Sequence, residues 1–162
     1  QNKYLFDFMG IHLRPGPVDE GGYTWIHDTT LTLVNINPTH YITSVKVNWG
    51  EKIPYTPSDS PSVEGMYPSI SLPNSEVYLN HCFKDGREKT VLCGFKYKDP
   101  ETGKVWMQDR GAWFKPVEDG MLFYFQAGHI ASDYENPNIS QMILNAIRWD
   151  PYPVTEPVIE RK

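Results

Sequence analysis

His129 lies in the stretch whose chemistry is easiest to recognise, directly after Gly128 and downstream of an apolar run at residues 121–125. An imidazole can act as a general acid or base or bind a metal ion, and an adjacent glycine lets another group approach closely. A loop histidine can equally do no more than hydrogen-bond the backbone where a helix begins. The sequence leaves both interpretations open, and His129 is the leading catalytic candidate.

The other four histidines, at positions 12, 27, 40 and 81, are isolated from one another in the sequence. None of the compact metal-binding spacings, such as H-x-x-H, H-E-x-x-H or C-x-x-C, occurs. A site for a divalent ion such as zinc would therefore need ligands that the fold brings together, and the first ligands to test are His12, His40 and His129. No other cofactor is predicted, since the chain has no glycine-rich phosphate loop.

The residues around His129 predict a strand, a loop and a helix. The run Met121–Phe125 is bounded by glycines and favours a central strand covered on both faces. Asn136-Pro137 is the cap and first-turn pair of a helix, and Asp150-Pro151 ends it. Apolar residues at three-and-four spacing indicate one long C-terminal helix: Ile139, Met142, Ile143, Ala146 and Ile147. In such strand–loop–helix units, ligand sites form where the strand ends.

The sequence of the N-terminal half predicts one short helix followed by strands and turns. Residues 3–9 predict a helix that stops at Gly10, followed by an extended piece. Residues 30–36 and 43–49 are rich in β-branched side chains and predict two strands. Residues 52–73 contain five prolines and many serines without periodicity, which predicts a long ordered loop or a mobile lid.

The middle of the chain predicts a β-meander. Residues 81–83 and 90–97 flank Asp85-Gly86, the signal of a hairpin. Residues 99–103 form the next turn, before a strand at 104–108. Residues 1–150 are therefore expected to form one domain or part of a domain, with residues 151–162 as a C-terminal arm.

Composition excludes several classes of function. The formal net charge is −5, and the basic residues are scattered, so nucleic acid and anionic membranes are not expected partners. No apolar run approaches the ~20 residues of a membrane-spanning helix. The chain begins at Gln1, which predicts that an upstream segment was removed. Cys82 and Cys93 could pair, which slightly favours a periplasmic or secreted location, or could be two buried thiols.

Several motifs together resemble the C-terminal part of the trehalose-utilisation (ThuA-like) family. That family has a tryptophan, an apolar strand ending in F-Y, then G-H, a proline and a helix closing on A-I-x-W. The matching residues here are Ala112-Trp113-Phe114, Phe123-Tyr124, Gly128-His129, Asn136-Pro137 and Ala146–Trp149. Upstream, Ser75–Tyr78 is similar to the family's D-E-x-Y segment, with Ser75 in place of the acid. The resemblance covers about residues 63–150.

This resemblance implies an α/β fold of the flavodoxin-like, class I glutamine-amidotransferase-like kind. Residues 1–60 do not supply the opening strands of such a sheet, so we expect a second polypeptide or a homo-oligomer to complete it. A glutaminase is not expected, because Cys93 lies in a strand pattern rather than in a strand-to-helix elbow.

The resemblance also implies a role in carbohydrate utilisation, with a small-molecule sugar as the ligand. If the chain is an enzyme, we expect a sugar-modifying hydrolase, lyase or isomerase with His129 as acid or base. Glu76 would orient the imidazole, and Tyr78 would bind a sugar hydroxyl. Equally, Glu76 could simply start a strand and Tyr78 pack beneath it. The competing class is a non-catalytic carbohydrate-binding or structural subunit, for which exposed tryptophans would supply stacking surfaces.

Overall fold

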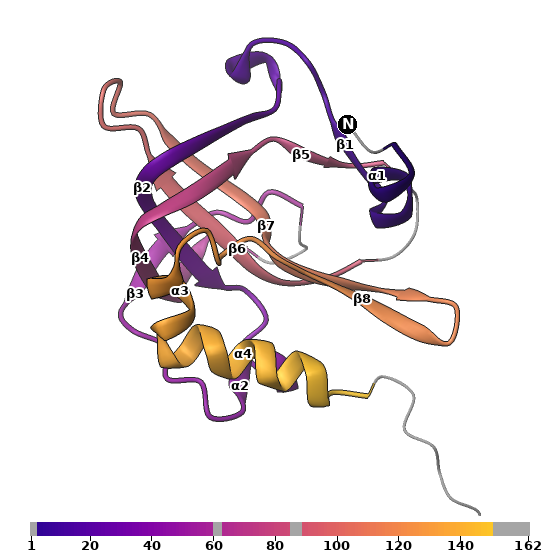
Figure 1. The fold of residues 1–162 in the computed structure, drawn as a ribbon. Coiled ribbons are helices and arrows are strands. Elements are labelled where there is room, and N and C mark those ends of the chain that lie inside the picture. Colours follow the sequence, from indigo (N-terminus) through magenta and orange to yellow (C-terminus); the bar gives the residue numbers. More distant parts are fainter. Residues whose placement is uncertain (1–2, 60–62, 85–88, 151–162) are drawn as a thin grey trace, which may run out of the picture.

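The computed structural model describes residues 3–59, 63–84 and 89–150 (Figure 1). Its main sheet has six strands in the order β3-β4-β2-β6-β7-β8, and a separate two-stranded sheet pairs β1 with β5. The strands are β1 (Ile11–Leu13), β2 (Thr24–Asn35), β3 (Lys52–Tyr55), β4 (Gly65–Leu79), β5 (His81–Phe83), β6 (Thr90–Lys98), β7 (Val105–Val117) and β8 (Gly120–Phe125). The helices are α1 (Lys3–Met9), η1 (Val18–Glu20), α2 (Tyr41–Ser44), α3 (Ala131–Glu135) and α4 (Pro137–Arg148).

The fold is β-rich, with two antiparallel sheets and a few short helices, and is α/β-like overall. It is not the parallel sheet that a flavodoxin-like fold would have, because every strand pair in the described part is antiparallel. Parallel neighbours need a crossover of a dozen or more residues, usually a helix. Here the β6–β7 and β7–β8 connections are short turns, the first of them the predicted 99–103 turn. The chain supplies all six strands of this sheet itself, which removes the original reason for expecting a partner chain.

The apolar strand β8 lies at an edge of the described sheet, so its prediction as a central strand is wrong. Met121, Phe123 and Phe125 pack against the main core, while Tyr124 on the other face stacks on Trp113 with ring centroids 5.2 Å apart. Both faces are therefore partly covered although only one side is paired with a strand. An unbroken apolar run indicates that both faces of a strand are covered, but it does not indicate how many strands pair with it.

The C-terminal region holds two short helices rather than one long helix: α3 lies in the segment predicted as a loop, and α4 occupies the span predicted to be helical from Asn136-Pro137. Helix α3 is five residues long and α4 is 12, with Asn136 between them. The Asn136 side chain accepts a hydrogen bond from the Asn138 N–H at 3.0 Å, and Pro137 occupies the first turn, as predicted. Helix α4 buries Ile139, Met142 and Ala146 against the core. It lies beside α2 beneath the sheet in Figure 1, where the Asn145 amide donates to the α2 carbonyl of Ile42.

The predictions for the N-terminal part of the chain are confirmed in part. Helix α1 with its stop at Gly10, whose φ is 70°, is confirmed, and so is the strand over residues 30–36, which lies almost wholly in β2. The strand predicted at 43–49 is wrong, since α2 and irregular backbone occupy that segment. Local hydrogen bonds explain this, because the Thr43 hydroxyl donates to the carbonyl of Asn37 and Ser44 donates to that of His40.

The segment 52–73 is not a loop or lid, because it holds β3 and the first part of β4, which pair with each other. Three of its five prolines lie where a strand tolerates them. Pro54 is in the edge strand β3, and Pro68 lies where β4 pairs only with β3. Pro73 lies at an irregularity in the β2–β4 register. The middle of the connection, residues 60–62, lies outside the described residues.

The predicted hairpin between residues 81–83 and 90–97 does not form. Strand β5 pairs with β1, whereas β6 pairs with β2 and β7. The Asp85-Gly86 signal and the arm at 151–162 lie outside the described residues. Cys82 and Cys93 sit in these different sheets and are both free, so no disulfide links them. Trp113, one of the residues that carry the family resemblance, is fully buried and packs in the interior.

Candidate functional site

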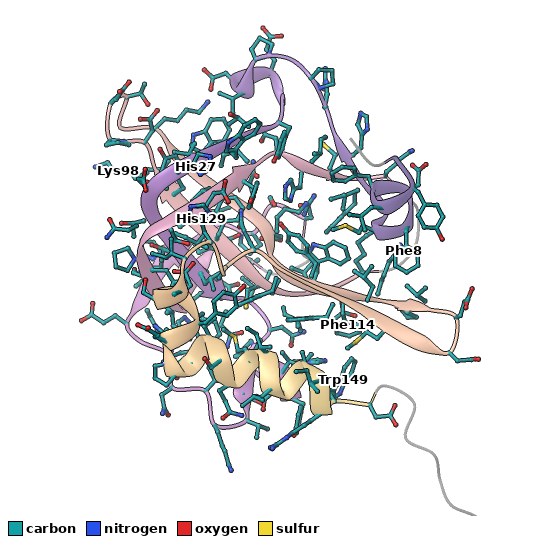
Figure 2. The ribbon with its side chains drawn as sticks, in the orientation of Figure 1. Phe8, His27, Lys98, Phe114, His129 and Trp149 are labelled. Carbon is teal, nitrogen blue, oxygen red and sulfur yellow. The ribbon has the colours of Figure 1, made fainter. Side chains whose placement is uncertain are left out.

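Glu76 joins two histidines that are far apart in the sequence. Its carboxylate oxygens lie 3.2 Å from Nδ1 of His27 and 3.2 Å from Nδ1 of His129. The Glu76 side chain is only 6% exposed, whereas those of His27 and His129 are 50% and 30% exposed. Figure 2 shows His27 on β2 and His129 after β8 lying near one another on the same side of the molecule. A buried carboxylate thus holds two solvent-accessible imidazoles.

The alternation of side chains along β2 and β4 brings Glu76 and His27 to the same face of the sheet. Opposite Ile26 in the β2–β4 register is Val77, and both side chains face the core. Side chains one residue away point to the other face. The sheet therefore presents Trp25 and His27 from β2, and Glu76 and Tyr78 from β4, on one surface. The register is irregular just beyond, where Asp28 has a φ of 50°, so the strand bends at the histidine.

Asp133 holds the turn that carries His129. Its Oδ2 accepts hydrogen bonds from the backbone N–H groups of Gly128 and His129 at 3.1 and 3.0 Å, and from the hydroxyl of Ser75 at 2.7 Å. Asp133 is 1% exposed, so these bonds are shielded from water. Gly128 has a φ of 121°, and a Cβ there would collide with the phenol oxygen of Tyr134. His129 therefore sits on a fixed turn, with its ring free to reach Glu76.

A cavity of about 470 Å³ opens beside the cluster and includes Glu76 and His129 in its lining. That is the size of a typical small-molecule site. Aromatic and polar side chains form much of the wall, and α1 adds Phe6 and Met9. Besides Phe6, Glu76 and His129, the aromatic and polar lining residues are Tyr23, Tyr78, His81, Tyr124, Phe125, Gln126 and Tyr134.

Burial strongly shifts the pKa of three groups in the cavity wall, Tyr78, His81 and Tyr124, of which the first two bear on the site chemistry. The Tyr78 hydroxyl donates to Oε2 of Glu76, and burial together with that hydrogen bond raises the pKa of Tyr78. The phenol therefore stays protonated at neutral pH. Burial, with a smaller effect from Arg110, lowers the pKa of His81 to about 4, so its ring is neutral at pH 7. His81 Nδ1 lies 3.3 Å from the Tyr124 hydroxyl.

Gln126 leaves one polar atom unused at the cavity. Its Nε2 donates to the backbone carbonyl of Tyr78 at 3.2 Å. Its Oε1 is buried and has no hydrogen-bond partner within the described part of the chain. Buried polar atoms are rarely left in this state.

The fold brings together His129, Glu76 and Tyr78, the three residues predicted to form the catalytic group. It does not bring His12 and His40 to them. His12 is exposed on β1, and His40 caps α2 by accepting the Ile42 N–H at 3.2 Å while its ring packs against Trp149. The grouping of His12, His40 and His129 as metal ligands is therefore wrong. Within residues 3–59, 63–84 and 89–150, the set that could hold a metal ion is His27, Glu76 and His129, whose ligand atoms lie within 4.8 Å of one another.

His27 is the residue that sequence reasoning missed. Its signal was the alternation of Tyr23, Trp25 and His27, which puts three rings on one face of an extended segment. The strand was predicted to begin only at residue 30, so this alternation was not used.

Fold and site define a β-rich protein with a His–Glu–His cluster beside a cavity of small-molecule size. The family model for ThuA, described as trehalose utilisation, matches residues 3–150, and the chain belongs to this family. The match begins well upstream of residue 63, where the resemblance in the sequence first became specific. Membership suggests a role in trehalose or carbohydrate utilisation.

No curated protein matches the chain. Of the helices in the described residues, none combines the length and the apolar character needed to cross a membrane.

Proposed function

We propose that the chain binds a sugar in the cavity beside Glu76 and performs an acid–base step on it with His129. The observation that carries this proposal is the contact of Glu76 with Nδ1 of both His27 and His129 at 3.2 Å. A carboxylate on one ring nitrogen fixes the tautomer and orientation of an imidazole, and it stabilises the imidazolium formed when the other nitrogen takes a proton. Nε2 of His129 is then the atom that exchanges a proton with the substrate.

The second imidazole gives the cluster a partner for that step. His27 shares the same carboxylate, and its ring centroid lies 5.3 Å from that of His129. One histidine can therefore accept a proton while the other donates one, as lyases and isomerases acting on oxidised or cyclic sugars require. Hydrolysis would use the same pair with a water molecule.

Sugar binding has physical support in the cavity wall. Tyr23 and Tyr134 offer ring surfaces for the apolar face of a pyranose, and Gln126 Oε1 can accept a hydrogen bond from a sugar hydroxyl. Tyr78 already donates its proton to Glu76. It would therefore bind a sugar hydroxyl as an acceptor rather than as a donor.

A cysteine-based glutaminase reaction has no support here. Cys93 is fully buried within β6, and burial raises the pKa of its thiol. A reactive cysteine needs the thiolate form and access to substrate.

The test is turnover of a panel of disaccharides and oxidised sugars by the wild type and by His129→Ala. We expect the variant to lose about 10²–10⁴-fold in rate, the usual contribution of a general acid or base. Its melting temperature should change little, because the ring is partly exposed. The matched control is His12→Ala, an exposed histidine on β1, which should keep full activity. Equal activity in His129→Ala and the wild type would contradict the proposal.

One observation favours the competing, non-catalytic function. Trp25 is 53% exposed, and its ring centroid lies 6.4 Å from that of His27, so a sugar could stack there without any reaction. Tryptophan fluorescence during sugar titration separates the two functions. Under the binding interpretation, sugar titration quenches the tryptophan fluorescence of the wild type, which turns over no sugar. Trp25→Ala then abolishes the quenching. Under the enzyme proposal, turnover depends on His129.

A further inference from the structure

We propose that His27, Glu76 and His129 bind a divalent transition-metal ion of the zinc type. This inference rests on the proposed function, because it assigns a resident ion to the same cluster, and it changes one part of that function. With an ion on Nδ1 of each ring, the ring proton would lie on Nε2, and a water molecule polarised by the ion would take over the proton transfer proposed for His129. The ligand atoms of the three residues all lie within 4.8 Å of one another, and they come from β2, β4 and the turn after β8.

The distances fit an ion as well as they fit hydrogen bonds. Zinc binds histidine nitrogen and carboxylate oxygen at about 2.0–2.2 Å, so neighbouring ligand atoms in a tetrahedral site lie roughly 3.3–3.6 Å apart. Each imidazole Nδ1 is 3.2 Å from an oxygen of Glu76. An ion can therefore replace the two Nδ1 protons with small movements of these groups. His27, whose side chain is half exposed, is free to complete the approach to His129.

The donor set selects the class of ion. Two imidazoles and one carboxylate suit zinc and neighbouring transition metals, whereas calcium takes 6–8 oxygen ligands and magnesium prefers oxygen and water. Three protein ligands leave at least one coordination position open. Glu76 and His129 line the cavity, so we infer that this position faces the sugar site. A bound ion there would polarise a sugar oxygen or a water molecule.

The surroundings are those of a supported metal site. Glu76 is held by the Tyr78 hydroxyl, and the backbone of His129 is held by Asp133, which also accepts from Ser75. Outer partners of this kind orient ligands, and their loss typically lowers metal affinity about 10–100-fold. Tyr78 and Asp133 are thus expected to affect metal binding without contacting the ion.

The experiment titrates chelator-treated full-length protein with Zn²⁺, and with Co²⁺ as a coloured probe, while melting temperature and bound metal are measured. We expect one equivalent of Zn²⁺, a higher melting temperature, and a visible Co²⁺ band typical of low coordination number. His27→Ala removes an exposed ligand with little risk to folding, and it should weaken binding at least about tenfold, with Tyr78→Phe weakening it by a similar factor. His12→Ala and titration with Mg²⁺ are the matched controls. Zinc binding that is absent, or equal in the wild type and His27→Ala, would overturn the inference.

The failure of this inference can be told apart from failure of the proposed function. If Zn²⁺ does not bind, or binds equally to the wild type and His27→Ala, while sugar turnover depends on His129, the metal inference fails and the acid–base proposal stands. If Zn²⁺ binds and depends on His27 while His129→Ala keeps full turnover, the acid–base proposal fails and the metal site stands.

Discussion

Replacing Asp133 with asparagine should loosen the His129 turn while preserving the shape of the side chain. Asp133 Oδ2 accepts three hydrogen bonds, from the N–H groups of Gly128 and His129 and from the Ser75 hydroxyl. The variant can keep an acceptor at that place, but it loses the negative charge. The change therefore isolates the contribution of charge to holding the catalytic turn.

The expected loss follows from the bonds. A hydrogen bond to a charged group contributes about 1.5–3 kcal/mol, against about 0.5–1.5 kcal/mol for a neutral pair, so each bond weakens by about 1 kcal/mol. The three bonds share one oxygen and will not add fully, so we expect a free energy of unfolding lower by about 2–3 kcal/mol. For a chain of this length, that lowers the melting temperature by about 4–12 °C.

The assay combines urea unfolding with hydrogen exchange of the Gly128 and His129 amides. Both amides should exchange faster in Asp133→Asn, and sugar turnover should fall because the imidazole is less well oriented. The control is Asp19→Asn, which removes an exposed carboxylate paired with Lys104 and should cost at most about 1 kcal/mol. If Asp133→Asn has wild-type stability and unchanged exchange at both amides, Asp133 does not position His129 and this reasoning is refuted.

Two further predictions concern the cavity wall. The pKa of His81 is about 4 in the folded protein and 6.5 in the unfolded chain, so the unfolded chain binds the proton more tightly. The free energy of unfolding should therefore fall by about 3 kcal/mol as the pH drops from 6.5 to 4. His81→Gln should flatten that part of a plot of unfolding free energy against pH. Gly128→Ala should lower the free energy of unfolding by more than about 1 kcal/mol, because φ is +121° and a methyl group would meet Tyr134. If Gly128→Ala melts at the wild-type temperature, the described turn is incorrect.

Local signals in the sequence were sufficient where the structure is decided locally. The Gly10 stop of α1, the Asn136-Pro137 start of α4 and the 99–103 turn each depend on a few adjacent residues, and each is found where it was predicted. The strand at 43–49 failed for the same kind of reason. Hydrogen bonds from Thr43 and Ser44 to nearby carbonyls favoured a helical turn over the β propensity of that segment.

The order of strands in the sheet could not be predicted from such local signals. The apolar run of β8 arises because the core covers one face and Trp113 the other, although the strand is at the edge of the described sheet. Prolines made residues 52–73 look like a loop, yet Pro54 lies in an edge strand and Pro73 at an irregular position in the ladder. The apolar run indicates burial, and the prolines indicate missing backbone N–H donors. Neither pattern indicates which strands are neighbours in the sheet.

The candidate site shows why His129 was predictable and His27 was not. His129 sits in a motif whose glycine, helix start and resemblance all lie within a few residues of it. His27 becomes part of the site only because β2 pairs with β4 in a register that sets Ile26 against Val77, and that pairing spans about fifty residues of sequence. Strand β4 also contacts the segment that carries His129, through the hydrogen bond from Ser75 to Asp133. A change in this register by one residue would turn Glu76 into the core and separate both histidines from their carboxylate. The strand pairing therefore has to form before the chemistry can exist.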